Sequence, residues 1–138
     1  MTAKSAPLSH PGLVRQNNED FIFADDDLGI YLLADGMGGH NAGEVASETA
    51  VKTAHSYLAE RLSSNSDNEI SALLSDAMNA AHEAVNMKAK NNLSLMGMGT
   101  TLVEVIIRGN KAFICHAGDS RAYYLRDVLH RITRDHTV

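Results

Sequence analysis

The chain has 138 residues, of which 44% are hydrophobic and 21% are charged, and its formal net charge is −5. This composition is typical of one folded globular domain and excludes a disordered chain. Mild acidity without a Lys/Arg cluster argues against nucleic-acid binding. The single cysteine, Cys115, excludes an intramolecular disulfide, and no apolar segment has signal-peptide or membrane-span length. We therefore expect a cytoplasmic protein without membrane contact.

The start of the sequence predicts a flexible entry and then a β-hairpin. Residues 1–11 are polar and contain two prolines, so we expect a flexible N-terminus, with a single domain over residues 12–138. Two short apolar runs, Phe21–Ala24 and Ile30–Asp35, have the length and composition of strands. The acidic segment between them, residues 25–29, ends in glycine and predicts a solvated turn.

Two helices are predicted next. Apolar residues recur at helical spacing from Gly43 to about Leu62, and a second stripe runs to about Asn91. Asn41 with Glu44 three residues later has the pattern of a capping box, and Ser66–Glu69 repeats the pattern before the second helix. The two stripes therefore predict a helical hairpin.

The second half of the sequence changes to β-rich patterning. Residues 100–107 are mainly β-branched, Gly109-Asn110 has the composition of a two-residue hairpin turn, and residues 111–116 resume an apolar run. Residues 121–126 and 129–132 predict two further short strands. Strands, then two helices, then a meander of strands indicate an α+β fold with mainly antiparallel pairing.

Acidic residues gather at the ends of three predicted strands: in residues 15–20, at Asp35-Gly36, and in residues 118–121. Carboxylates brought together from distant segments repel each other unless a cation neutralises them. Oxygen ligands favour Mg²⁺ or Mn²⁺ over zinc. The alternative for Asp35 is a tight strand-to-helix turn in which the aspartate caps and the glycines bend. Arg15 could hold two phosphate oxygens, or it could be a solvated surface group.

Five segments together resemble the signature blocks of the PPM family, the type 2C metal-dependent serine/threonine phosphatases, in a form similar to the bacterial branch. The blocks occur in the family's order and cover nearly the whole chain. They are Arg15–Asp20, Asp35–His40 with Gly43–Ser47, Gly99–Thr101, His116–Tyr123 and Thr133–Thr137.

The resemblance implies an α/β/β/α sandwich of two antiparallel sheets flanked by helix pairs, with a binuclear Mn²⁺ or Mg²⁺ site at one end. By the match, Asp35 would bridge both metals and the carbonyl of Gly36 would bind one of them. Glu19 and Asp20 would act mostly through metal-bound waters, and Asp119 would hold a third ion.

The implied reaction is hydrolysis of phosphoserine and phosphothreonine in proteins, opposing a Ser/Thr kinase. A water shared by two cations is acidified and attacks the phosphorus. Arg15 would hold the substrate phosphate. His40 is either the general acid that protonates the leaving alkoxide or a residue that shapes the glycine loop, because some relatives carry the histidine directly after Asp-Gly, where this chain has Met37.

The resemblance also implies that the C-terminal part of the fold is absent. The family's domain continues beyond its Asp-His-Thr block and includes two later aspartates that complete the metal pair. We therefore expect residues 12–138 to be the N-terminal portion of an incomplete catalytic domain, with marginal stability in isolation. The alternative is a non-catalytic binding or regulatory module derived from the same fold.

Overall fold

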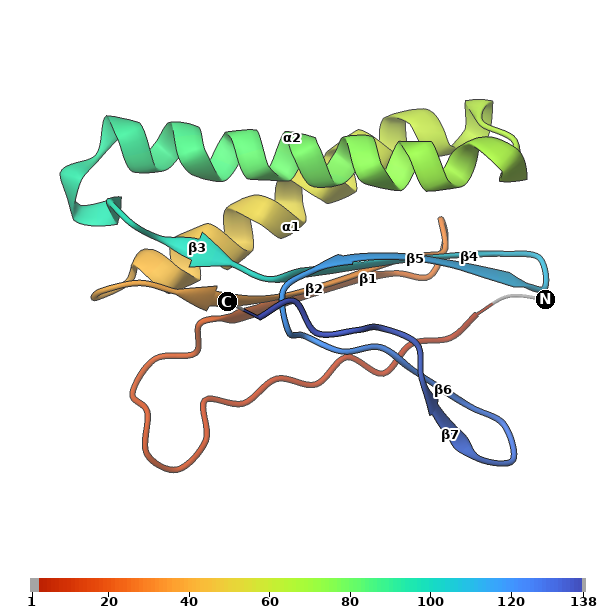
Figure 1. Cartoon of the computed structure of the whole chain (residues 1–138), viewed down its shortest axis with the longest axis horizontal. Helices are drawn as coiled ribbons and strands as arrows, with labels where there is room; N and C mark the ends of the chain where they lie inside the picture. Colours follow the sequence, from red (N-terminus) through yellow and green to blue (C-terminus); the bar gives the residue numbers. More distant parts are fainter. Residues whose placement is uncertain (1–2, 138) are drawn as a thin grey trace.

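A computed structural model describes residues 3–137. Residues 1–2 of the predicted N-terminal segment and residue 138 of the predicted domain lie outside the described range. Two helices cover one face of an antiparallel sheet, and a small hairpin and the N-terminal segment lie on the opposite face (Figure 1). The predicted α+β class is confirmed. Among residues 3–137, no helix combines the length and the hydropathy needed to cross a membrane.

The main sheet contains five strands in the order β1-β2-β4-β5, with β3 also paired to β2. Its strands are β1 (Asp20–Asp25), β2 (Ile30–Met37), β3 (Gly99–Thr100), β4 (Leu102–Arg108) and β5 (Lys111–Ala117). All of the pairings are antiparallel. The hairpins predicted around residues 25–29 and 109–110 are confirmed. The β-branched run after residue 99, however, is divided between β3 and β4.

The two predicted helices are α1 (Ala42–Arg61) and α2 (Ile70–Asn91), joined by short 3₁₀ turns at residues 62–64 and 67–69. α1 lies between α2 and β2, and it packs against both. It buries small side chains, Ala46, Ala50 and Ala54, at no more than 2% exposure. Small residues let the helix axis approach its two neighbours closely, so α1 occupies the centre of the core.

The two predicted capping boxes have different outcomes. Asn41 precedes α1 but makes no side-chain cap, because its backbone has ψ of 9° rather than an extended value. Its side-chain oxygen instead accepts a hydrogen bond from Asn17 Nδ2 at 3.4 Å. The box of Ser66 and Glu69 is present, but it caps the 3₁₀ turn that leads into α2. The first box is therefore wrong, and the second is confirmed one turn earlier than predicted.

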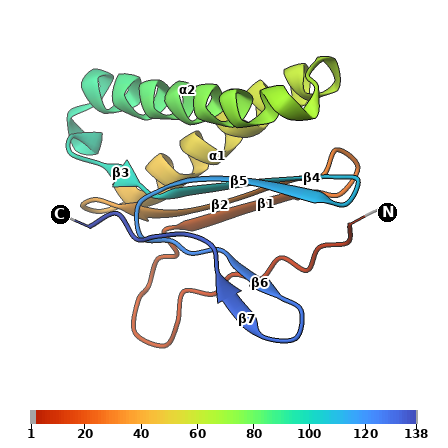
Figure 2. The ribbon, with the colours of Figure 1, turned by 45° about the vertical axis from the view of Figure 1, so that its right-hand side comes forward.

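Strand β2 alternates between the two faces of the sheet. Ile30, Leu32 and Ala34 are buried under the helices, whereas Leu33 and Asp35 point to the opposite face. A hairpin of β6 (Tyr123–Leu125) and β7 (Leu129–Arg131) lies on that opposite side (Figure 2). Its large apolar side chains are about half exposed or more: Tyr123, Tyr124, Leu125, Val128 and Leu129.

The N-terminal segment also lies on the face opposite the helices (Figure 1). Residues 3–11 have no regular secondary structure. The Ser5 amide donates to an Asp26 carboxylate oxygen at 3.4 Å, and the Ser9 hydroxyl accepts from Asn18 at 2.6 Å. The flexibility expected for residues 1–11, and the division of the chain after them, stay predictions.

One carboxyl group lies inside the apolar core. On β4, Leu102, Glu104 and Ile106 share the face that the helices cover, and Glu104 is 0% exposed. Neither of its carboxyl oxygens has a hydrogen-bond partner among the described residues. Cys115 lies directly opposite on β5. A buried carboxyl group without a hydrogen-bond partner is costly in its charged form. The β-rich pattern of the sequence does not predict this burial of Glu104.

Candidate metal centre

Two predicted ligands lie directly opposite each other at the end of the first hairpin. The register of β1 and β2 pairs Asp20 with Asp35, so both side chains point to the face away from the helices. Burial, followed by the charge and hydrogen bonding of Asp20 and the charge of Asp119, raises the pKa of the Asp35 carboxyl. Arg15 acts in the opposite direction on that pKa. These four predicted residues therefore share one electrostatic environment.

The glycines after Asp35 permit close backbone contacts. The Gly36 amide donates to the carbonyl oxygen of Glu19 at 3.0 Å. A Cβ atom on Gly36 would overlap the carbonyl of Gly43, and one on Gly43 would overlap the Glu19 carboxylate, so both positions require glycine. Glu19 Oε2 is buried here and has no hydrogen-bond partner among residues 3–137. An orphaned carboxylate oxygen beside Asp35-Gly36 suits a further partner such as a cation or its bound water.

Asp35 and Asp119 line one cleft of about 440 Å³. Thr101 lines it as well, and holds Asp35 on both sides of the backbone. Its hydroxyl accepts from the Asp35 amide at 2.9 Å, and its own amide donates to the Asp35 carbonyl at 3.0 Å. The same hydroxyl lies 2.6 Å from the Ser120 hydroxyl. In the sequence, Gly99–Thr101 was a motif without an assigned role. In the structure, its Thr101 binds the backbone of Asp35 and lines the cleft.

The last sequence block supports the Asp119 loop. Arg121 donates to both carboxylate oxygens of Asp135, at 3.0 and 2.7 Å. The His136 amide donates to the Gly118 carbonyl at 3.0 Å, and the Gly118 amide lies 3.2 Å from His136 Nδ1. The His136 ring stacks on His116 at 4.6 Å between centroids. His136 also lines the cleft, a position that the sequence reasoning missed because the contact spans 18 residues.

His40 occupies the turn between β2 and α1, outside the group of residues that line the cleft. It is exposed, and its φ of 53° places it in the left-handed region. That conformation favours glycine or asparagine over other residues. The geometry agrees with a role in shaping the loop, and the choice between that role and the general acid stays open to experiment.

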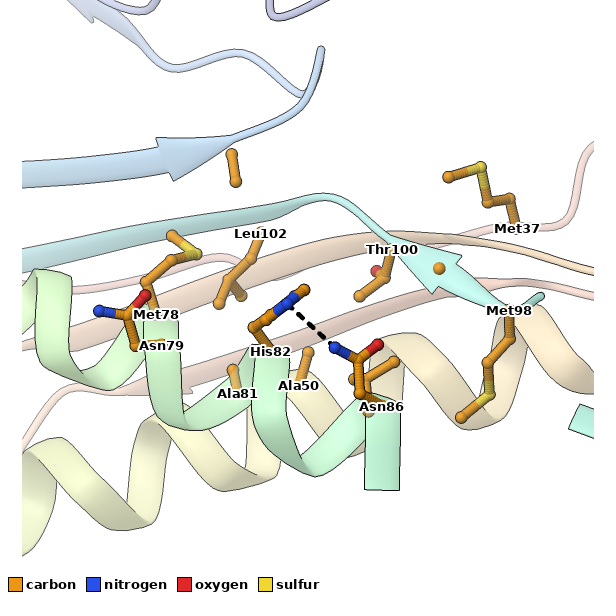
Figure 3. A pocket seen from close by; sticks show the side chains of 13 residues that line it. Met37, Ala50, Met78, Asn79, Ala81, His82, Asn86, Met98, Thr100 and Leu102 are labelled. Atoms are coloured by element: carbon orange, nitrogen blue, oxygen red, sulfur yellow. Dashed lines mark hydrogen bonds between the residues drawn. The ribbon is translucent and has the colours of Figure 1, made fainter. Parts of the chain in front are cut away.

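A second cavity, of about 420 Å³, lies behind β3 on the helix side of the sheet. Figure 3 shows Met78 and Met98 at its walls, and His82 hydrogen-bonded to Asn86 at 2.9 Å. Met37 lines both this cavity and the carboxylate cleft. The two-residue strand β3 therefore forms a thin wall between the apolar core and the candidate site.

The donor set of the site fits a hard divalent cation. Asp20, Asp35 and Asp119 offer carboxylate oxygens, Gly36 offers a carbonyl, and Glu19 contributes an unpartnered oxygen. Among residues 3–137, no three His, Cys, Asp or Glu side chains form a compact metal-binding cluster. The described residues thus place oxygen donors beside an open cleft without gathering them into a compact cluster.

Comparison with known proteins defines the family. Residues 10–137 match the family described as Protein phosphatase 2C, and the chain belongs to that family. It is 41% identical to the serine/threonine protein phosphatase PstP of Mycobacterium tuberculosis over 138 residues, covering 99% of the chain and 26% of PstP. It is 37% identical to the serine/threonine phosphatase stp of Listeria innocua over 131 residues, covering 92% of the chain and 52% of that protein.

Solved structures agree with this assignment. A crystal structure of the catalytic domain of PstP in complex with two manganese ions aligns with a TM-score of 0.80 at 41% identity, covering 93% of the chain and 54% of that structure. PppA, a regulatory component of type VI secretion in Pseudomonas aeruginosa, aligns with a TM-score of 0.80 at 38% identity, covering 94% and 56%. The expected phosphatase fold is confirmed. The chain spans from about a quarter to about half of the length of these relatives.

Proposed function

We propose that the chain supplies the N-terminal portion of a metal-dependent protein phosphatase, which hydrolyses phosphoserine and phosphothreonine in proteins and opposes a Ser/Thr kinase. The observation that carries the proposal is the pairing of Asp20 with Asp35 across two antiparallel strands, where Asp35 lines a cleft together with Asp119. Three carboxylates from separate segments need a cation to neutralise them. Membership of the Protein phosphatase 2C family, and relatives named as serine/threonine phosphatases, give independent support.

The proposed ligands of the metal pair, Mn²⁺ or Mg²⁺, are the Asp35 carboxylate and the Gly36 carbonyl. Glu19 and Asp20 would hold metal-bound waters, and Asp119 would hold a third ion. The PstP structure with two manganese ions supports a binuclear site. When bound, such a metal pair acidifies a water and neutralises the charge that develops on phosphate.

The chain's own residues would do the rest of the work. The glycines at 36 and 43 bring the backbone and the Glu19 carboxylate close to Asp35, because no side chain stands between them. Arg15, whose charge already acts on Asp35, would bind the substrate phosphate through its planar guanidinium. His40 would either protonate the leaving alkoxide or only shape the loop.

The decisive test is Mn²⁺-dependent hydrolysis of a phosphothreonine peptide. The assay compares this chain with the polypeptide that its gene encodes up to the stop codon, each as the native sequence and as Asp35→Asn. Asp76→Asn, an exposed carboxylate on α2, is the matched control. We expect turnover that Asp35→Asn abolishes and Asp76→Asn leaves unchanged. Peptide binding without turnover in both lengths would instead support the non-catalytic module, and turnover retained by Asp35→Asn would refute the assigned site.

A further inference from the structure

We propose that the hydroxyl of Thr101 is the positioning group that fixes Asp35 and Asp119 relative to each other. The inference rests on the proposed function and adds a residue to it. Thr101 occupies the single-residue break between β3 and β4, where the chain leaves one pairing of β2 and enters the next. At that break its side chain faces the cleft, between the end of β2 and the loop after β5.

The hydrogen bonds of Thr101 form a continuous chain between the two carboxylate segments. The Asp35 amide donates to Thr101 Oγ1 at 2.9 Å, and that same oxygen lies 2.6 Å from Ser120 Oγ. A hydroxyl has one proton and two lone pairs, so it can accept from an amide and still share a hydrogen bond with a second hydroxyl. Ser120 directly follows Asp119 in the sequence. One side chain thus connects the backbone of one proposed ligand to the neighbour of another.

The methyl group of Thr101 contacts the other flank of Asp119. Gly118 has a φ of 101°, and a Cβ atom built on it would lie 2.6 Å from Thr101 Cγ2. The threonine methyl therefore packs directly against the Gly118 backbone. Asp119 is exposed and lies between two residues that Thr101 contacts, Gly118 through the methyl and Ser120 through the hydroxyl. Serine would keep only the hydroxyl, and valine would keep only the methyl.

The two hydroxyl contacts matter because Asp35 and Asp119 repel each other and lie on different elements. Metal ligands must be held within about 0.5 Å of their productive positions, and loop residues need support to achieve this. Loss of an outer hydrogen bond to a ligand typically weakens metal affinity by about 10- to 100-fold. Removing the Thr101 hydroxyl should therefore loosen the Asp119 loop and weaken cation binding while the fold is retained.

The first arm of the test uses the metal-free chain and NMR hydrogen exchange. We expect Thr101→Val to accelerate exchange of the Asp35 amide by at least about 10-fold, since that amide loses its acceptor, and to shift the amides of residues 118–120. Thr101→Ser should preserve both properties. The Gly36 amide, which donates to Glu19, is the internal control. Unchanged Asp35 exchange and unchanged loop amides in Thr101→Val would refute the link, whether or not the chain binds metal.

The second arm measures Mn²⁺ affinity from paramagnetic relaxation, with urea unfolding in EDTA to report the stability of each variant. Thr101→Val should bind Mn²⁺ about 10- to 100-fold more weakly, and Thr101→Ser should remain within about 3-fold. Thr53→Val on α1 controls for the substitution itself. Wild-type affinity in Thr101→Val, combined with weak binding in Asp35→Asn, would overturn the positioning role.

Two further results separate this inference from the proposed function. If Asp35→Asn binds Mn²⁺ as tightly as the wild type, the proposed metal site fails, and the exchange arm alone decides the Thr101 link. If Thr101→Val does not fold, Ser120→Ala replaces it, because that variant keeps both Thr101 contacts with Asp35 and removes only the bond to the loop. Shifted amides at Gly118 and Asp119 with weaker Mn²⁺ binding would then support the link, and unchanged values would refute it.

Discussion

The buried carboxyl of Glu104 makes the stability of this fold depend on pH in an unusual direction. Burial raises the pKa of Glu104 from 4.5 to about 8, and the Cys115 thiol opposite offsets only part of that effect. The folded protein therefore holds a proton on this group at neutral pH that the unfolded chain releases. Folding stability contributed by Glu104 is fully present below pH 4.5 and is lost as the pH rises toward 8.

The size of the effect follows from that interval. At pH 7 the solution is about 2.5 pH units above the pKa of Glu104 in the unfolded chain but still below its pKa in the folded protein. Ionisation of Glu104 therefore favours the unfolded state by about 3 kcal/mol. Replacement of Glu104 by leucine removes this term and places an apolar group among Leu102 and Ile106. Repacking at similar volume typically costs less than about 1.5 kcal/mol. We therefore expect Glu104→Leu to stabilise the chain by roughly 2 kcal/mol at pH 7 and by much less at pH 5.

Urea unfolding at pH 5, 6, 7 and 8 tests this expectation. The wild-type midpoint should fall relative to that of Glu104→Leu as the pH rises. Glu104→Gln should have the same flat pH dependence as leucine, but lower stability, because its buried amide also lacks partners. Glu83→Gln, an exposed glutamate on α2, should run parallel to the wild type. Parallel curves for the wild type and Glu104→Leu would show that the carboxyl is solvated or paired in the folded state, and would refute the reasoning.

Three further substitutions test individual contacts. Arg108 donates to two carbonyl oxygens of the turn between the helices, each at 2.6 Å, so Arg108→Met should lower the free energy of unfolding by about 2–4 kcal/mol, and an unchanged urea midpoint would contradict the structure. Gly36→Ala should cost more than about 2 kcal/mol by overlap with Gly43, whereas Gly39→Ala, with open space around it, should stay within about 0.5 kcal/mol in the same unfolding assay. His40→Gly should keep phosphatase turnover if His40 only shapes the loop, and turnover lost equally in His40→Gly and His40→Ala would instead identify the general acid.

Much of the fold was predictable because its signals are local. Alternation of Ile30, Leu32 and Ala34 identifies the buried face of β2, and the alanines of α1 recur at helical spacing. The same local reasoning failed at Asn41, whose side chain bonds to Asn17, 24 residues away, and does not cap α1. The alternation pattern also shows which residues of a strand share one face, but it does not show which face the helices cover. The burial of Glu104 could therefore not be predicted.

For the candidate site, too, local sequence patterns predicted some residues and missed the contacts between distant ones. Strand-end carboxylates pointed to Asp20, Asp35 and Asp119. The structure places Asp35 and Asp119 in the lining of one cleft and Asp20 opposite Asp35 in the hairpin, and their roles as ligands stay predictions. The pairing of Asp20 with Asp35 depends on the hairpin register, which the four-residue turn between the strands, residues 26–29, sets. Thr101 and Ser120 lie 19 residues apart, and no local signal predicts that their hydroxyls meet.

The fifth sequence block, Thr133–Thr137, supports the loop that carries Asp119. Asp135 accepts two charge-assisted hydrogen bonds from Arg121, which lower the pKa of its carboxyl, so the aspartate is committed to the loop rather than available as a metal ligand. His136 holds the Gly118 backbone through two hydrogen bonds, one donated by its amide and one accepted by its ring Nδ1. The loop that carries Asp119 is thus fixed from the Thr101 side and from residues 133–137. Because the second support follows the loop in sequence, the placement of Asp119 depends on the chain being ordered at least through His136.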